Sequence, residues 1–353
     1  MIDQPTRIRS GEELPVDQLT EYFKSQGIDL AGPLEIEQFP SGYSNLTYFL
    51  KSGEKEWVLR RPPFGAKIKS AHDMGREFNV LSMLMPVFPY VPAPVAYCED
   101  EEVLGAPFYI MERVRGLILR NKAPESFTAS TWKSLSERVV DQLAEMHGLD
   151  LSSTGLDQLG KPEGYARRQV EGWIKRYHNA KTDEIASMDE VEGFMMAHIP
   201  DDVPPAMIHN DYKYDNIVLD PDDPTKILAI LDWEMATIGD PAMDLATSLA
   251  YWSEPSDHPA LRPFNLTWIE GNLDREEVVN RYMEKSGREI HNMVFYYAYA
   301  CYKLGVICQQ IYARYKLGYT KDPRFAMLIE VVKACGENAR RAIEKDRISK
   351  LYP

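Results

Sequence analysis

His209-Asn210-Asp211-Tyr212-Lys213-Tyr214-Asp215-Asn216 is the stretch that decides the fold, and Asp232-Trp233-Glu234 begins sixteen residues after Asn216. A polar loop between strands would account for one or two of these side chains, but not for all of them. A fixed H-x-D-x-K-x-x-N string arises by chance in a chain of this length with a probability on the order of one in a thousand. The stretch therefore predicts a functional site.

Phosphoryl transfer gives each of these residue types a role. The Asp211 carboxylate can orient a substrate hydroxyl and accept its proton, and Lys213 can reach the oxygens of the transferring phosphoryl group. Asn216 and Asp232 are oxygen donors, which suit a hard cation such as Mg²⁺ on nucleotide phosphates. No set of His and Cys partners for zinc lies near them in the sequence.

The pattern of apolar and polar residues changes along the chain. Alternating and β-rich runs predict strands, and apolar residues at helical spacing predict one helix among them, at 71–85. After Gly116 the patterns are mainly helical, apart from short apolar runs between 207 and 232. The expected strands cover 34–39, 46–51, 56–60, 95–98 and 108–114, and the expected helices cover 16–25, 131–147, 165–180, 190–197, 240–252, 276–285, 293–315 and 323–345.

These patterns predict an α+β fold with a small antiparallel β-lobe and a larger, mainly helical lobe. We expect an N-terminal extension with a short helix over 1–33, a β-lobe over 34–114, and a helical lobe over 115–353 that contains the polar stretch 209–216.

Composition excludes several classes of protein. The 353 residues carry 54 acidic and 40 basic side chains, a net charge of −14, which argues against a duplex-coating nucleic-acid binder. The four cysteines form no C-x-x-C pair, so neither a disulfide framework nor a zinc site is indicated. With no signal-peptide pattern and no apolar run of about 18 residues, we expect a cytoplasmic protein without membrane contact.

The negative charge is concentrated around the polar stretch. Residues 201–260 hold 13 acidic and two basic side chains, whereas residues 51–69 hold six basic and two acidic ones. A bound Mg²⁺ would neutralise part of the acidic segment, so metal dependence is expected.

The H-x-D-x-K-x-x-N string and the later Asp resemble the protein-kinase-like superfamily. Within it, residues 34–320 resemble the aminoglycoside phosphotransferase family, in particular the branch found as kinase-like domains joined to acyl-CoA dehydrogenases. The resemblance implies a bilobal kinase-like fold. It also implies that Asp211 is the catalytic Asp, Lys213 the catalytic-loop lysine, Asn216 and Asp232 the magnesium ligands, and His209 the brace of the loop.

The same resemblance implies that the β-lobe over 34–114 covers the nucleotide, and that the helical lobe over 115–353 carries the catalytic loop and the acceptor pocket. Arg60 takes the position of the nucleotide-binding lysine, and Glu77 on the following helix could pair with it. If the strand register is off by one residue, the role moves to Arg61. The phosphate-covering turn has a single glycine and comprises Ser41, Gly42, Ser44 and Asn45. The hinge that binds adenine is assigned loosely to Glu112 and Val114.

Several further residues have structural interpretations. Asp240 is expected to cap the helix that begins at Pro241, and the resemblance makes Asp244 a brace of the catalytic loop. Glu234 replaces the glycine of the kinase D-F-G segment, and either a structural role or an approach to metal or substrate is open. The tyrosine-rich helix 293–315 either lines the acceptor pocket or forms core.

The resemblance implies an ATP- and Mg²⁺-dependent kinase that phosphorylates a hydroxyl of a small molecule. A pseudokinase that binds nucleotide without transfer is the alternative, supported by Arg60 and the single glycine of the turn. A metal-dependent phosphoesterase would need more His or carboxylate ligands than the sequence offers here. Two kinds of acceptor stay open, an aminoglycoside-like polycation and a hydroxyacyl-CoA-like anion. The phosphates of the second could bind to four basic residues, Arg113, Arg115, Arg120 and Lys122. These residues could equally form a solvated face. The sequence does not indicate the oligomeric state.

Overall fold

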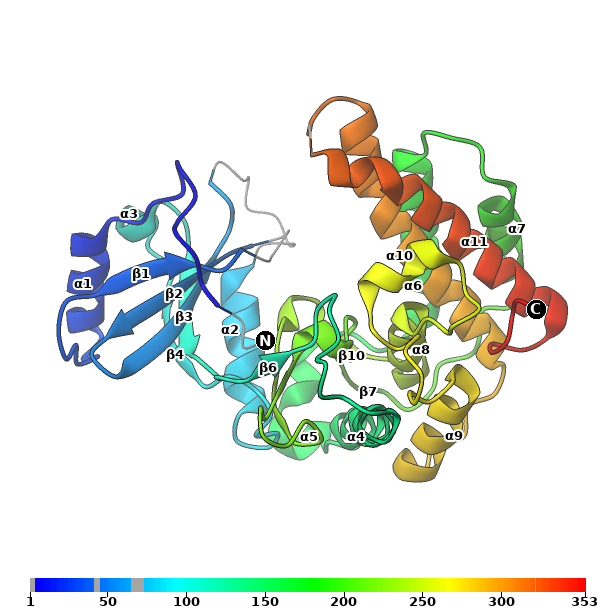
Figure 1. Ribbon diagram of the computed structural model, residues 1–353, viewed down its shortest axis with the longest axis horizontal. Helices are drawn as coiled ribbons and strands as arrows, with labels where there is room; N and C mark the ends of the chain where they lie inside the picture. Colours follow the sequence, from blue (N-terminus) through cyan, green and yellow to red (C-terminus); the bar gives the residue numbers. More distant parts are fainter. Residues whose placement is uncertain (1–3, 41–44, 65–72, 321) are drawn as a thin grey trace. The chain divides into compact units, whose positions relative to one another are not determined.

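The computed structural model describes residues 4–40, 45–64, 73–320 and 322–353, which form two units. Unit 1 comprises Met1–Ile118 and Ile217–Met235, and unit 2 comprises Leu119–Asn216 and Ala236–Pro353 (Figure 1). An antiparallel β-region followed by a mainly helical part confirms the predicted α+β fold class.

Unit 1 is built on a five-stranded antiparallel sheet with the order β1-β2-β3-β5-β4. The strands β2 and β3 are joined by a tight turn in which Gly53 has a φ of 60°, a backbone conformation that glycine adopts at no steric cost. The strand bounds are β1 Glu35–Gln38, β2 Leu46–Ser52, β3 Lys55–Arg61, β4 Pro94–Cys98 and β5 Phe108–Glu112.

Two helices cover opposite faces of this sheet. Helix α1 (Val16–Ser25) sets Phe23 edge-on against Trp57, with 5.2 Å between ring centroids. Because side chains alternate along a strand, Trp57 and Leu59 face α1, whereas Arg60 faces α2 (Met74–Leu84) and meets Glu77 there. The remaining elements of unit 1 are α3 (Glu101–Leu104), the short strands β6 (Leu117–Ile118), β8 (Ile217–Leu219) and β9 (Ile227–Ile230), and η4 (Trp233–Met235).

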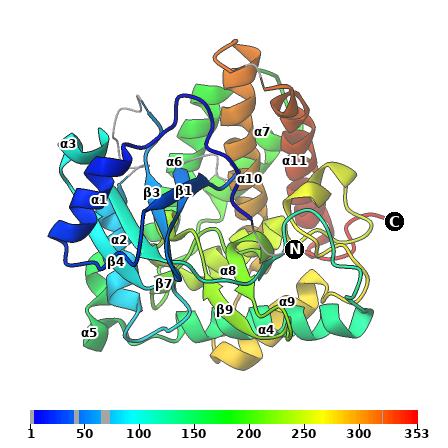
Figure 2. The ribbon, with the colours of Figure 1, turned by 60° about the vertical axis from the view of Figure 1, so that its left-hand side comes forward.

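Unit 2 is a helical assembly around α8 (Pro241–Tyr251), in which every residue is buried. Asp240 caps this helix by accepting the Ala242 N–H, and Pro241 occupies the first helical position, as predicted. The long helix α10 (Met293–Lys316) packs against α6 (Tyr165–Ala180), α7 (Ala186–Ala197), α8 and α11 (Leu328–Lys345), and Figure 2 shows it beside α7 and α11.

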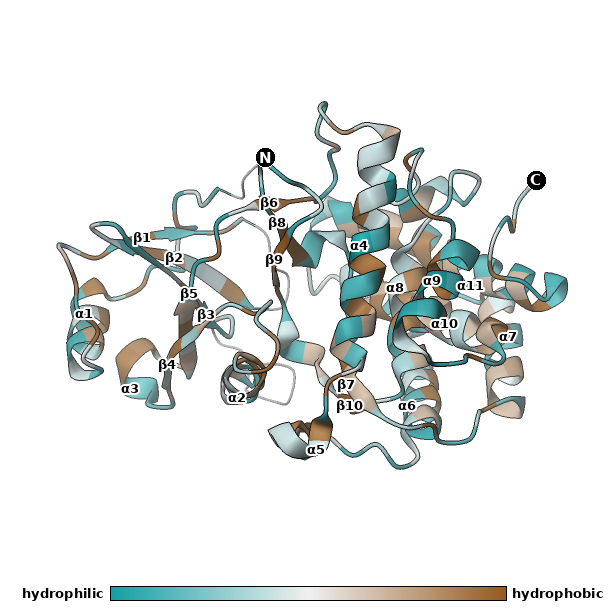
Figure 3. Ribbon diagram, turned by 90° about the horizontal axis from the view of Figure 1, so that it is seen from below, coloured by the Kyte–Doolittle hydropathy of each residue, from teal (hydrophilic) through white to brown (hydrophobic). Residues whose placement is uncertain are grey.

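The other elements of unit 2 complete this assembly. Helix α4 (Ala129–His147) carries hydrophilic and hydrophobic residues on different sides (Figure 3) and packs against α9 (Arg275–Ser286). A short antiparallel pair, β7 (Ala206–Ile208) and β10 (Thr237–Gly239), leads into the polar stretch and into α8. The short elements are α5 Leu151–Thr154, η2 Leu156–Leu159, η3 Tyr214–Asn216, η5 Pro259–Phe264 and η6 Pro323–Met327.

The structure bears on two features of the composition, the apolar segments and the cysteines. Among the described residues, no helix is both long and apolar enough to cross a membrane. All four cysteines are buried free thiols.

Candidate active site

The polar stretch forms a loop of unit 2 that runs from the end of β7 through η3. Its second residue, Asn210, has a φ of 67°, which is uncommon for a residue other than glycine. Asn210 keeps this conformation because the surrounding structure bonds its backbone on both sides.

Asp244 of α8 holds the start of this loop. Its Oδ2 accepts the His209 N–H at 2.8 Å, and its Oδ1 accepts the Asn210 N–H at 2.6 Å. Oδ2 also lies 3.0 Å from His147 Nε2, and the other ring nitrogen of His147 lies 2.7 Å from the Tyr282 hydroxyl. Burial alone would raise the pKa of Asp244, but the His147 hydrogen bond and charge outweigh burial, so its pKa lies below the ordinary value. The geometry gives Asp244 the bracing position that the resemblance implied.

Asp211 lies among three polar partners on the same loop. Lys213 Nζ is 2.6 Å and Asn216 Nδ2 is 2.8 Å from Asp211 Oδ2, and the Asp211 N–H donates to His209 Nδ1 at 3.2 Å. The Asp211 side chain keeps 16% of its surface exposed, so a substrate can still reach it. Burial would lower the pKa of Lys213, but the Asp211 carboxylate outweighs burial and raises it, which keeps Lys213 charged.

Tyr251, at the end of α8, is a fourth neighbour that the sequence analysis missed. Lys213 Nζ lies 4.7 Å from the centre of its ring, within the range of a cation–π contact. Burial first, and then the charge of Asp211 and a hydrogen bond to it, raise the pKa of the Tyr251 hydroxyl. Tyr251 follows Asp244 by seven residues, two helical turns, so both lie on one face of α8. That spacing is the only sequence signal for Tyr251, and it also fits an ordinary core position.

Arg60 forms ion pairs with three carboxylates of unit 1. It is buried, with Nη1 2.5 Å from Glu77 Oε1 and Nη2 3.0 Å from Asp232 Oδ1 and 3.4 Å from Glu234 Oε2. Burial would lower the pKa of Arg60, but these carboxylates raise it, Glu77 most of all. Burial also raises the pKa of Glu77. The structure therefore brings together Arg60, Glu77 and Asp232, three of the predicted site residues.

Arg61, the alternative to Arg60, points elsewhere. Its guanidinium donates to the carbonyls of Pro62 and Leu104 and lies 3.7 Å from the ring centre of Phe64. No carboxylate is among these partners in the described structure. Of the two arginines, Arg60 is the one that pairs with Glu77.

The phosphate-covering turn is described only in part. Ser41, Gly42 and Ser44 lie outside the described residues. Asn45 is buried and donates through Nδ2 to Glu234 Oε2 at 2.8 Å. Glu234 is thus bonded to a residue of the turn as well as to Arg60, a link that the sequence did not suggest.

The predicted hinge residues, Glu112 and Val114, lie at and just beyond the end of strand β5. Glu112 is the exposed last residue of β5, and its N–H donates to the Ala93 carbonyl. Val114 follows two residues later, outside the strand and half-buried. Backbone groups, rather than these side chains, are what a hinge would offer to an adenine.

The basic residues after β5 are partly engaged within unit 1. Arg113 lies 3.2 Å and Arg115 2.5 Å from the Glu56 carboxylate, and Arg113 also stacks 4.6 Å from the ring centre of Phe49. Two of the four cations that could bind an anionic acceptor are therefore already paired with the Glu56 carboxylate.

Four tyrosines of α10 are buried in the core of unit 2, namely Tyr296, Tyr297, Tyr299 and Tyr302, whereas Tyr312 and Tyr315 are half-buried. This burial favours a core role for the first four.

Asn216 and Asp232 present oxygen donors, the type of ligand that hard cations such as Mg²⁺ prefer. Asn216 uses its Nδ2 for Asp211, which leaves its amide oxygen as a ligand atom. No group of three or more His, Cys, Asp or Glu side chains suited to a metal was found in the described part of the chain. Mg²⁺ commonly takes one or two protein ligands and completes its shell with phosphates and water, so two such donors would be enough to hold it.

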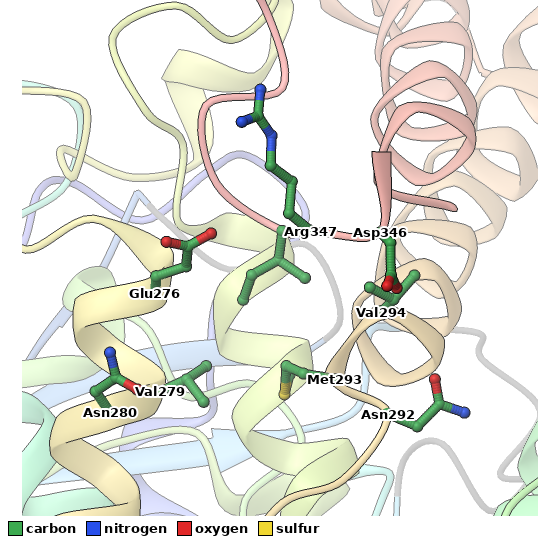
Figure 4. Close-up of a pocket in the computed structure, with 9 residues that line it drawn as sticks. Glu276, Val279, Asn280, Asn292, Met293, Val294, Asp346 and Arg347 are labelled. Atoms are coloured by element: carbon green, nitrogen blue, oxygen red, sulfur yellow. The ribbon is translucent and has the colours of Figure 1, made fainter. Parts of the chain in front are cut away.

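One pocket of unit 2 holds none of the predicted site residues. It has a volume of about 430 Å³ and lies between α9, the start of α10 and the C-terminal segment (Figure 4). Its polar lining includes Glu276, Asn280, Asn292 and Arg347.

Curated relatives share sequence with most of this chain. Acyl-CoA dehydrogenase family member 11 of Rattus norvegicus is 34% identical over 304 residues, 85% of this chain and 39% of the relative. Acyl-CoA dehydrogenase family member 10 of Mus musculus is 33% identical over 312 residues, 87% of this chain and 29% of the relative. The chain thus spans less than half the length of either relative.

Solved structures share the fold. A provisionally assigned aminoglycoside phosphotransferase of Ralstonia eutropha superimposes with a TM-score of 0.82 at 28% identity, covering 94% of this chain and 99% of that chain. Two more distant structures show likeness of fold alone. Aminoglycoside 2'-phosphotransferase-IIIa in complex with GDP has a TM-score of 0.59 at 17% identity, covering 92% of this chain and 99% of that chain. Spectinomycin phosphotransferase in complex with ADP and spectinomycin has a TM-score of 0.56 at 13% identity, covering 92% of this chain and 94% of that chain.

The family comparison covers the β-sheet, the polar loop and α8. The model of the phosphotransferase enzyme family matches residues 35–278, more than half of the chain. The chain therefore belongs to the phosphotransferase enzyme family.

Proposed function

We propose that this protein is an ATP- and Mg²⁺-dependent kinase that transfers the γ-phosphoryl group to a hydroxyl of a small molecule, with Asp211 as the catalytic base. Family membership supports phosphoryl transfer to a small molecule in general. The observation that carries the finer proposal is the partly exposed Asp211 carboxylate, held between Lys213 and Asn216.

Each atom of the transfer step has a place in this proposal. The acceptor oxygen attacks the γ-phosphorus, its O–H proton passes to Asp211, and the bond between the γ-phosphorus and the bridging oxygen breaks to release the nucleoside diphosphate. Lys213 stays charged beside Asp211 and lowers the cost of negative charge that develops on the phosphoryl oxygens.

Arg60 is proposed to bind nucleotide phosphate in place of the usual lysine. A guanidinium keeps its charge and can contact phosphate through two N–H groups. Glu77 fixes the Arg60 side chain at 2.5 Å and limits the conformational entropy that binding would cost. The ADP and GDP complexes of the fold neighbours support a nucleotide as donor, and both ATP and GTP belong in the test.

Asn216 and Asp232 are proposed to hold Mg²⁺, which would supply charge neutralisation to the nucleotide phosphates. Asn216 offers its amide oxygen within unit 2, and Asp232 offers a carboxylate within unit 1. The roles of Ser41, Gly42, Ser44, Asn45, Glu112 and Val114 in nucleotide binding stay predictions.

The acceptor is proposed from the two groups of relatives. The names of the curated relatives favour a hydroxyacyl-CoA-like alcohol, and those of the fold neighbours favour an aminoglycoside-like one. Because Glu56 already binds Arg113 and Arg115, an anionic acceptor would have to compete with that carboxylate or use other cations.

Asp211→Asn tests the proposal. The wild-type protein should release ADP from MgATP when it is given a panel of hydroxyacyl-CoAs and aminoglycosides. The variant should lose at least about 1,000-fold in kcat and still bind MgATP, since the amide keeps the shape but cannot accept the proton. Wild-type protein that binds MgATP and turns over none of the panel would favour the pseudokinase alternative, for which Arg60 in place of the lysine is the supporting observation.

A further inference from the structure

Lys303 is a buried lysine of unit 2 that the proposed chemistry does not use. It lies in the middle of α10 with 2% of its surface exposed. Its ammonium donates to the Asn210 carbonyl at 3.1 Å, to Asn210 Oδ1 at 3.3 Å and to Thr247 Oγ1 at 3.4 Å. An ammonium has three N–H donors, and these three acceptors use all of them.

Asn210 is bonded at every polar atom, and Lys303 provides two of the bonds. Asp244 accepts its N–H, Lys303 donates to both of its oxygens, and its Nδ2 donates to the Tyr165 hydroxyl at 3.2 Å. The amide orientation is self-consistent, because its oxygen faces a donor and its nitrogen faces an acceptor. Asn210 directly precedes Asp211 and has a φ of 67°, so these bonds set the direction in which the chain presents Asp211.

Among the described residues, no carboxylate forms an ion pair with Lys303. Its three hydrogen-bond acceptors in the described structure are neutral oxygens. The charged groups that act on it are Asp244 of α8 and Asp211 and Lys213 of the loop, and Trp173 of α6 lies 5.9 Å away as a cation–π partner. Burial lowers the pKa of Lys303 to about 8, against the opposing effect of the two carboxylates.

We propose that Lys303 is a positioning residue, whose ammonium locks Asn210 and thereby orients Asp211 for proton transfer. The inference rests on the proposed function for its effect on turnover. A neutral amine has only two N–H donors, so one of the three acceptors loses its bond when Lys303 loses its proton. Lys303 would thus couple the long helix α10 to the catalytic loop, 93 residues away in sequence.

The first test reads the loop without turnover. In apoprotein at pH 7, Lys303→Met should speed amide hydrogen exchange in the peptide that covers residues 207–216 by about tenfold or more. Lys175→Met is the matched control, because Lys175 is an exposed lysine of the neighbouring helix α6, and it should leave this exchange unchanged. Unchanged exchange in Lys303→Met would overturn the inference, whether or not the protein is a kinase.

The second test separates positioning from general stability. At pH 7, Lys303→Met should lower kcat by about 10- to 100-fold with little change in the KM for MgATP. Wild-type kcat should also fall as the pH rises through about 8, and this fall should be absent in the variant. Lys303→Gln, which keeps an N–H donor group, should be intermediate and serves if Lys303→Met does not fold. A wild-type protein without turnover defeats the proposed function alone, whereas equal pH profiles of kcat in an active wild type and variant defeat the role of Lys303.

Discussion

The carboxylate of Asp244 accepts the first two N–H groups of the polar loop 209–216, with Oδ1 2.6 Å from the Asn210 nitrogen. The two residues are 34 positions apart in the sequence, and the contact fixes the loop to the buried helix α8. A carboxylate suits this place because both of its oxygens accept hydrogen bonds.

Asp244→Asn should destabilise unit 2 by about 2–4 kcal/mol at pH 7, because the amide nitrogen turns a donor toward groups that also donate. The pKa of Asp244 is lower in the folded protein than in the unfolded chain, so its contribution to stability is complete above the unfolded pKa of about 4 and is lost as the pH falls through the folded pKa. Urea unfolding of wild type and variant between pH 3 and 7 should show a difference that shrinks below pH 4.

Asp157→Asn is the matched control for that experiment, since Asp157 is an exposed carboxylate of the same unit, in η2. Its effect should stay within about 0.5 kcal/mol. A difference between wild type and Asp244→Asn that stays constant down to pH 3 would contradict the assigned role of the ionised carboxylate.

Glu77→Ala should destabilise unit 1 by about 3 kcal/mol, because it leaves Arg60 buried with one carboxylate fewer. The same change should raise the KM for MgATP, since Arg60 would no longer be fixed by its shortest contact. Urea unfolding and steady-state kinetics measure the two effects.

The exposed turn residue Glu54 offers the control, and Glu54→Ala should cost less than about 0.5 kcal/mol and leave the KM unchanged. Destabilisation without any change in the KM or in MgATP binding would mean that the Arg60–Glu77 pair only supports the fold.

Local patterns in the sequence predicted most of the fold. Helix α1 has the predicted bounds, Val16–Ser25, because amphipathic spacing and the stop at Gly27 are local signals. Helix α7 begins at Ala186, four residues earlier than expected, since its first turn has no side-chain cap to mark it.

Within the candidate site, the sequence predicted the group of residues that belong to one linear motif. Asp211, Lys213 and Asn216 share one loop, so their spacing alone brings them together. The Arg60 or Arg61 question needed the sheet register, in which Arg60 pairs with Thr47 and Tyr109. Contacts of Lys303 and Tyr251 with the loop depend on how helices pack, and no local pattern carries that information.

Magnesium should be required for nucleotide to stabilise the protein. At a concentration of 100 times its Kd, MgATP should add about 2.7 kcal/mol to the free energy of unfolding, whereas ATP with excess EDTA should add far less. Thermal denaturation measures both, and Asn216→Ala should reduce the MgATP effect. Equal stabilisation by ATP with and without the metal would contradict the proposed roles of Asn216 and Asp232.

Tyr251→Phe should lower kcat by about tenfold with little change in the KM for either substrate, since it removes the hydroxyl beside Asp211 and keeps the ring beneath Lys213. Tyr302→Phe is the matched control: its hydroxyl is bonded to Glu192 at 3.3 Å, within the same unit, and its loss should change stability by about 1 kcal/mol and leave kcat unchanged. A kcat that is unchanged in Tyr251→Phe would show that the hydroxyl does not act on Asp211, and would leave Tyr251 only its packing contact with Lys213.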